Sequence, residues 1–269
     1  MTVISAPITV RPHDDLLHVI KLMEYQYVPK AVVADEFDNP LGIITQKDIL
    51  QKLDSLRGRS LSDVFVSELM KTDFIKLENG VDPLEAARLL VERGEPMIVV
   101  TSEEGNVVGM VLKKDLVSYY ASLVKGVHKV SDIMSKPPIT IDERAPIGEA
   151  LNLMRSKNIA RLIVTSESGK VVGLLSTNDI LFGLPFITKT NCSDIPVKEL
   201  MNPSVNFASP SEDLNSVAKM ISKRVPRSAV VLENGKPVGI VTSSDIVRAL
   251  TDESTKKYLM EIKMYTSLF

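Results

Sequence analysis

Apolar residues along this chain follow two alternating spacings, and the same order of spacings returns four times. In the first stretch, apolar residues between 16 and 23 recur three or four positions apart, which predicts one buried face of a helix. Two short β-branched runs follow, at 30–34 and 41–45, with turn residues between them. Runs that are almost entirely apolar are typical of strands covered by helices. A second helix is expected from Asp48.

The same succession is expected three more times downstream. Each unit reads as a strand start, a helix, a hairpin and a second helix, which predicts a mixed α/β (α+β) fold built from small sheets. A last helix is expected over 256–267. The later first helices are expected around 84–91, 147–154 and 214–221, and the later hairpins over 97–112, 161–176 and 227–242.

A short stretch closes every hairpin: a glycine, apolar residues and, six positions after the glycine, an aspartate. The four copies end at Asp48, Asp115, Asp179 and Asp245, at intervals of 64–67 residues. A fixed period of this size indicates a repeated supersecondary unit. Three units also open on Val-x-(Glu/Asp)-(Leu/Ile)-Met, ending at Met70, Met134 and Met201.

One unit of about 60 residues buries too little surface to be stable alone, so the units are expected in pairs. The break at Gly126 favours a division into residues 1–123 and 124–269. The first domain would hold units over 1–54 and 64–123. The second would hold units over 128–184 and 195–250, followed by the C-terminal helix.

Composition narrows the classes of function. Apolar residues make up 44% of the chain and charged residues 25%, and the net charge is −2, so no basic field favours nucleic acid or an acidic membrane. No apolar run approaches the roughly 20 residues of a membrane span. With a single cysteine, Cys192, and no visible signal peptide, the chain is expected in the cytoplasm.

Catalytic chemistry is not apparent. The three histidines, His13, His18 and His128, share no spacing with one another or with a carboxylate, so they are expected at the surface and no metal site is predicted. No nucleophile elbow, phosphate-binding loop or dinucleotide fingerprint occurs. We therefore expect a protein that is not an enzyme.

The repeated stretches resemble the cystathionine-β-synthase (CBS) domain family. The resemblance covers essentially the whole chain as four CBS repeats in two tandem pairs, often called Bateman modules. It is carried by the four glycine-to-aspartate stretches and by the three openings that end in methionine; the first unit lacks that opening. The layout is similar to the gamma subunit of AMP-activated protein kinase and to stand-alone microbial four-motif proteins.

The resemblance implies a non-enzymatic regulatory sensor of AMP, ADP or ATP that acts on an unidentified protein partner and needs no other cofactor. In relatives, the ligand lies in the cleft between the two motifs of a pair. The aspartate binds ribose, a hydroxyl and a basic residue bind phosphate, and apolar and proline-flanking residues hold adenine. A carboxylate can accept two ribose O–H groups, and a helix N-terminus favours phosphate.

Carried onto this chain, these roles give three groups of candidate residues and a fourth, weaker one. The weaker cleft has Met97 where a basic residue is expected and Leu112 where a hydroxyl is expected. The candidates are Ile8, Pro29, Lys30, Thr45 and Asp48; Ile139, Arg161, Ser176 and Asp179; Val205, Pro226, Arg227, Thr242, Ser244 and Asp245; and, in the weaker cleft, Pro96, Lys113 and Asp115.

Several alternatives stay open. A hydroxyl followed three residues later by an aspartate is also ordinary helix capping, and Arg161 and Arg227 are also compatible with solvated positions at the start of a strand. The clefts could take another adenosyl ligand, S-adenosylmethionine or NAD, or none, in a structural or interaction protein. The two pairs could close into a monomeric disc through Leu116, Leu181, Val247 and Leu250, or the chain could form a homodimer.

Overall fold

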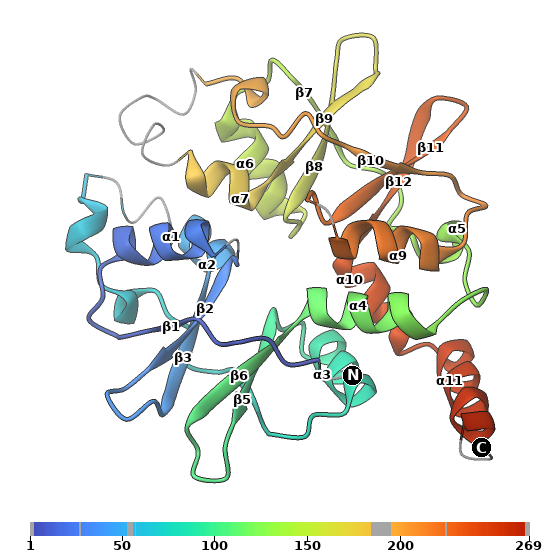
Figure 1. The fold of residues 1–269 in the computed structure, drawn as a ribbon. Coiled ribbons are helices and arrows are strands. Elements are labelled where there is room, and N and C mark those ends of the chain that lie inside the picture. The colour runs from blue at the N-terminus through green and yellow to red at the C-terminus, as the bar shows by residue number, and fades with distance from the viewer. Residues whose placement is uncertain are drawn as a thin grey trace.

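A computed structural model describes residues 3–26, 28–52, 56, 58–183, 195–223 and 225–266. In this part of the chain, four three-stranded sheets, one from each repeat, surround a common centre (Figure 1). In every sheet the first strand pairs in parallel with the second, which forms an antiparallel hairpin with the third. The mixed α/β class and the four-repeat architecture are confirmed.

The strands and longer helices follow the same order in every repeat, and the last three repeats open on a short helical turn: η3 (Val66–Glu68), α5 (Val130–Ile133) and η4 (Val197–Glu199). The first repeat contains β1 (Thr9–Val10), α1 (Leu16–Tyr25), β2 (Lys30–Ala34), β3 (Pro40–Thr45) and α2 (Gln46–Gln51). The second contains β4 (Ile75–Glu78), α3 (Pro83–Glu92), β5 (Met97–Thr101), β6 (Val107–Leu112) and α4 (Lys113–Leu123). The third contains α5 (Val130–Ile133), β7 (Thr140–Asp142), α6 (Ile147–Ser156), β8 (Arg161–Thr165), β9 (Val171–Ser176) and α7 (Thr177–Phe182). The fourth contains β10 (Asn206–Ala208), α9 (Leu214–Lys223), β11 (Ser228–Glu233), β12 (Lys236–Thr242) and α10 (Ser243–Leu250), and α11 (Glu253–Thr266) follows.

The opening segments of the repeats are exchanged within each pair. Ser5, before β1, exchanges backbone hydrogen bonds of 2.8 and 3.0 Å with Met110 on β6 of the second repeat. Lys71, before β4, does the same with Ile43 on β3 of the first repeat, at 2.8 and 2.9 Å. In the second pair, the exchanged contacts are Ser135 with Ile240 and Asn202 with Leu174. Each repeat therefore supplies one edge of its partner.

This exchange explains the glycine of the repeated stretch. A Cβ added to Gly239 would lie 2.6 Å from Sδ of Met134 and 3.0 Å from the carbonyl oxygen of Ser135. Gly42 and Gly173 meet the opening segments of their partner repeats in the same way, at Lys71 and at Met201. The glycine is needed because the partner's backbone passes directly over the strand.

Two kinds of core hold the molecule together. Inside the first pair, the sheets face each other through residues such as Val32, Val99 and Met110. Inside the second pair, the equivalent cluster is Ile163, Leu174 and Val230. Between the pairs, helices of the first repeat pack with those of the third, and helices of the second with those of the fourth. The expected contact residues Leu116, Val247 and Leu250 lie in one of these helical cores, and Leu181 lies in the other. The expectation that helices close the two pairs against each other within one chain is confirmed.

The sequence expectation for His128 is wrong. His128 is buried, with 8% of its surface exposed, and its Nε2 lies 2.9 Å from the hydroxyl of Thr255 on α11. That helix begins at Glu253, three residues earlier than the spacing predicts, and the earlier start lets its first turn cover the histidine. Cys192 lies outside the described residues. In the described part of the chain, no helix is both long and apolar enough to cross a bilayer.

Candidate functional site

One carboxylate oxygen of each repeated aspartate caps the helix that follows its strand. In all four repeats, Oδ2 accepts the backbone N–H of the residue three positions earlier. In three of them the side-chain hydroxyl of that residue donates to the same oxygen, at 2.6–2.7 Å. These bonds are those of Thr45 with Asp48, Ser176 with Asp179 and Thr242 with Asp245; in the second repeat, Leu112 offers only its N–H to Asp115. The capping interpretation is therefore correct for one oxygen of each carboxylate.

The second oxygen, Oδ1, distinguishes the repeats. The hydroxyl of Ser5 donates to Oδ1 of Asp115 at 2.8 Å, and that of Ser135 donates to Oδ1 of Asp245 at 2.7 Å. Arg248 also donates to Oδ1 of Asp245, which is only 2% exposed. Among the described residues, Oδ1 has no partner in the other two aspartates, Asp48 and Asp179. Those two carboxylates keep a free acceptor, as a ribose contact would require.

Basic side chains from different repeats meet at the centre. Lys30 stands opposite Thr45 in the sheet, and Arg161 stands opposite Ser176. Burial, followed by repulsion from Lys113 and Arg161, lowers the pKa of Lys30 to about 8. A lowered pKa of this kind is expected for a cation that is partly removed from water and lies near other cations.

Burial also shifts the pKa values of the ionisable groups near Lys30. Burial lowers the pKa of Arg161; Asp179 opposes that change, and Arg227 adds to it by repulsion. Burial also lowers the pKa of Lys113, with repulsion from Lys47. Burial raises the pKa of both Asp115 and Asp179. The cations of the four repeats are therefore close enough to act on one another. The helices that follow the four hairpins, α2, α4, α7 and α10, lie around the centre of the molecule (Figure 1).

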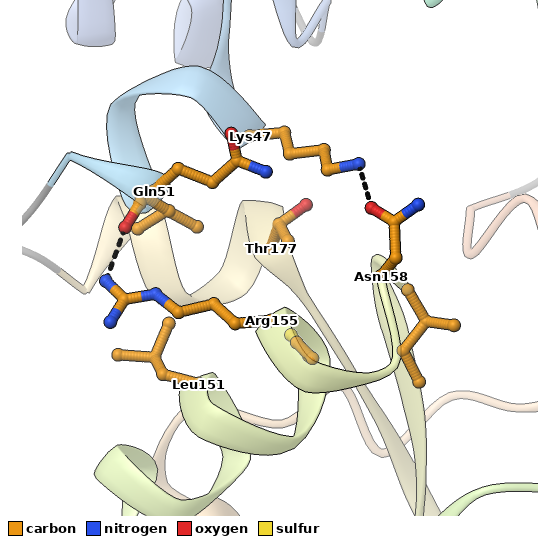
Figure 2. Close-up of a pocket in the computed structure, with 9 residues that line it drawn as sticks. Lys47, Gln51, Leu151, Arg155, Asn158 and Thr177 are labelled. Atoms are coloured by element: carbon orange, nitrogen blue, oxygen red, sulfur yellow. Dashed lines mark hydrogen bonds between the residues drawn. The ribbon is translucent and has the colours of Figure 1, made fainter. Parts of the chain in front are cut away.

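Direct contacts link opposite repeats at this centre. Lys113 donates to the hydroxyl of Ser244 at 3.1 Å, and Lys47 donates to the side-chain oxygen of Asn158 at 2.6 Å. Figure 2 shows Lys47 and Asn158 at a small cavity of about 30 Å³ between α2 and α6, where Arg155 donates to the carbonyl of Leu50. That volume suits a water molecule rather than a nucleoside.

A larger cavity lies beside Asp115. It measures about 460 Å³, which is within the range of small-molecule sites. Its walls come from both repeats of the first pair, because the opening segment of the first repeat crosses to the second. Ile8 is thereby placed at the cleft of Asp115 and not at that of Asp48. The lining residues are 5–9, Leu22, Gln26, Val28, Met110 and Lys114.

The remaining candidates are placed as follows. Arg227 donates to the carbonyl of Ser222 at 3.1 Å, and the carbonyl of Pro226 accepts a bond from Asn206. The carbonyl of Pro29 accepts the N–H of Gln46. Pro96 is partly buried between Glu95 and Met97, while Ile139 and Val205 pack against two of the hydrophobic cores.

Sequence reasoning missed several polar groups near these positions. Ser135 could have been found, because it follows the opening methionine of its repeat as Lys71 and Asn202 follow theirs. Ser5 could not, because the first repeat lacks that opening. Gln46 had no such signal. It is 2% exposed, and both polar atoms of its amide lack a partner within the described residues. A buried amide without partners is costly and is typical of a site that something else completes.

Comparison with known proteins gives a consistent picture. Residues 3–55, 66–122, 130–185 and 197–252 each match the model of the CBS domain. An uncharacterized 33.4 kDa protein in the ribosomal RNA operon of Thermofilum pendens is 25% identical over 280 residues, covering 93% of each chain. The fold is similar to that of protein MJ1225 from Methanocaldococcus jannaschii, a proposed archaeal homolog of g-AMPK, with a TM-score of 0.80 and 17% identity over 91% of this chain and 96% of that one. A conserved protein from Pyrococcus horikoshii matches with a TM-score of 0.65 and 21% identity, covering 93% and 98%.

Proposed function

The chain belongs to the CBS domain family, as a regulatory module of two CBS pairs, and from this premise we propose that it senses adenine nucleotides. Binding of AMP, ADP or ATP at the clefts would change the affinity of the module for a protein partner. The module itself would carry out no reaction. Within the described residues, no three histidine, cysteine or acidic side chains form a group able to hold a metal ion.

The observation that carries the proposal is the set of poorly compensated cations at the centre. Lys30, Lys113 and Arg161 all lose part of their basicity through burial, and they come from three different repeats. A phosphate group placed between them would supply the missing negative charge, and helix N-termini there would add N–H donors. Phosphate is the part of the ligand that this centre suits best.

The carboxylates support the ribose part of the same ligand. Asp48 and Asp179 each have a capping oxygen and a second oxygen without a partner among the described residues. Each lies in the helix that follows a hairpin, and the first strand of that hairpin begins with a basic residue, Lys30 or Arg161. A nucleotide bound with its ribose at the aspartate would therefore direct its phosphate inward.

A second candidate function follows from the cleft of Asp115. It contains the cavity of about 460 Å³, yet Met97 and Leu112 replace the basic residue and the hydroxyl found in the other repeats. Lys114 is the cation that lines the cavity. This cleft suits an adenosyl ligand with little phosphate, and S-adenosylmethionine is an example. NAD, with two phosphates, would be favoured at the other clefts.

Calorimetry of the full chain with AMP, ADP, ATP, S-adenosylmethionine and NAD tests the proposal. We expect a dissociation constant in the micromolar range for at least one adenine nucleotide, equivalent to about −8 kcal/mol. Binding should also raise the melting temperature, because the ligand binds only the folded state. If no adenosyl ligand binds at about a hundred micromolar, the nucleotide-sensing function is excluded and a ligand-free interaction protein is left. Preferential binding of S-adenosylmethionine would favour the second candidate.

A further inference from the structure

The two clefts of the first pair have equivalent walls with different chemistry. Val28 and Glu95 each lie directly before a proline and two residues before the first strand of a hairpin. Val28 lines the large cavity beside Asp115. Because the opening segments are exchanged within the pair, the equivalent position of Glu95 lies on the wall of the Asp48 cleft. A carboxylate in that cleft thus replaces an apolar side chain in the other.

The opening segments lead to the same placement. Lys71 bonds to Ile43 through its backbone, as Ser5 bonds to Met110, and both bonded partners lie two residues before the residue that caps the next helix. Ser5 reaches Asp115 directly, so Lys71 occupies the corresponding edge of the Asp48 cleft. Nζ of Lys71 lies 2.5 Å from Oε1 of Glu95, which fixes the carboxylate at that edge.

Glu95 has an unusual environment for a charged residue. It is 4% exposed, and its second oxygen, Oε2, has no hydrogen-bond partner within the described residues. An unpaired oxygen of a buried carboxylate is costly, and the cost disappears when a donor arrives. The ion pair with Lys71 stabilises the charge through Oε1, so the buried Oε2 is left without a donor in the described part of the chain.

We propose that Glu95 is a specificity-determining residue of the Asp48 cleft, where its free oxygen accepts a hydrogen bond from the exocyclic amino group of adenine. The inference rests on the proposed binding of adenine nucleotides. It places the three parts of the ligand along one cleft: phosphate toward Lys30, ribose at Asp48 and the base at Glu95. A 6-oxopurine would instead set its carbonyl oxygen against the carboxylate, with no proton between the two acceptors.

The test compares AMP with purine riboside 5′-monophosphate, which lacks only the amino group, and with inosine monophosphate. Binding is followed on the full chain by NMR of ¹³C-methyl methionine. Met70, next to Lys71, reports the Asp48 cleft, and Met110 reports the cavity beside Asp115. We expect AMP to bind at least about tenfold more tightly than purine riboside monophosphate at the Met70 cleft, as a bond to a charged acceptor provides.

Glu95→Ala should reduce this preference to about twofold or less at Met70 and leave the ratio at Met110 unchanged. Glu92→Ala is the matched control, because Glu92 pairs with Arg88 on an exposed face three residues away. Glu95→Gln keeps the side-chain volume and a neutral hydrogen-bond acceptor, so it should retain part of the preference for AMP over purine riboside monophosphate. This variant serves as the test if Glu95→Ala does not fold.

An unchanged ratio in Glu95→Ala, or tighter binding of inosine monophosphate to the parent chain, would overturn the role of Glu95. If AMP moves neither methyl signal although calorimetry detects its binding, the inference about Glu95 fails while the nucleotide-sensing function stands at the clefts of the second pair. If calorimetry detects no binding either, the nucleotide-sensing function fails and the inference fails with it. The two failures are therefore distinguishable.

Discussion

At the scale of single residues, the repeated aspartates divide their two oxygens between structure and binding. Oδ2 caps a helix in every repeat, whereas the surroundings of Oδ1 differ from one repeat to the next. Asp245 is the extreme case, since Ser135 and Arg248 both donate to its Oδ1. The same residue type therefore contributes differently to stability in different repeats.

We expect Asp245→Asn to lower the free energy of unfolding by about 2–4 kcal/mol, because the new NH₂ group must face a donor on either side. Asp48→Asn should lose less than about 1 kcal/mol, because its NH₂ can take the unoccupied side while the remaining oxygen caps the helix. Urea unfolding of both variants against the parent chain measures the difference. Equal losses in the two variants would show that the donors to Oδ1 of Asp245 do not contribute to the free energy of unfolding.

The lowered pKa of Lys30 gives a prediction about pH. Its folded-state pKa of about 8 lies below the ordinary 10.5, so the folded protein bears the full cost of charging Lys30 below pH 8. As pH rises from about 8 to 10.5, this group makes the free energy of unfolding increase. Lys30→Met should remove that contribution, which unfolding measured across this pH range will show.

Phosphate binding should raise the pKa of Lys30, which burial lowers. A bound anion raises the pKa of Lys30 toward its ordinary value, so AMP binding at pH 8 should take up a fraction of a proton. Calorimetry in two buffers with different ionisation enthalpies measures this uptake. Lys30→Met should abolish it and weaken AMP binding; uptake that persists in the variant would assign the proton to another group.

At the scale of elements, the spacing of apolar residues predicts the longer helices and the hairpin strands to within a few residues. It is wrong for the openings of the last three repeats, which form short helical turns such as α5 instead of strand starts. The exchange of opening segments was beyond that reasoning. It depends on contacts such as Ser5 with Met110, which lie about a hundred residues apart in the chain and leave no periodic signal. For the same reason, the sequence assigned Ile8 a role without showing which cleft it lines, and it gave no indication that Glu95 or Gln46 would be buried.

The glycines offer a test of the exchanged packing. Gly239→Ala should cost about 1–3 kcal/mol, because its Cβ would collide with Met134 and with the backbone of Ser135. Gly148→Ala is the control: Gly148 lies in α6 with open space around it, so the variant should be stabilised by about 0.5–1 kcal/mol. Thermal and urea unfolding distinguish the two, and a neutral Gly239→Ala would mean that the opening segment moves aside at no cost.

At the scale of the whole molecule, the pairs are joined by two helical cores and a charged centre. The sequence of a single repeat shows neither the helical cores nor the charged centre, because each helical core needs helices from both pairs. The apolar faces of these helices could nevertheless be recognised in the sequence, since their residues exceed what one repeat needs to cover its own sheet. The charged centre could be recognised only in part: Lys30, Arg161 and Arg227 were found by their place in the repeat, but not their mutual repulsion.

Val247→Asp should separate the second and fourth repeats, because it places a charge in a helical core where Val247 is fully buried. We expect a larger radius of gyration by small-angle scattering and a lower melting temperature, with the helix and strand content of each pair retained. Val91→Asp, on the exposed side of α3, is the control and should change neither. A compact particle in the Val247→Asp variant would contradict the helical closure.

The crossing of opening segments also constrains how such a chain can change its length. In a lone repeat, the third strand of the sheet would lack the hydrogen bonds that the partner's opening segment supplies. The repeat's own opening segment would lack a strand to bond to. Each cleft needs residues from both repeats of a pair. Adding one repeat to this protein, or deleting one, would therefore leave an incomplete cleft. Gene duplication can therefore extend this architecture only in steps of two repeats, and recombination between relatives should preserve function when its breakpoints fall between pairs.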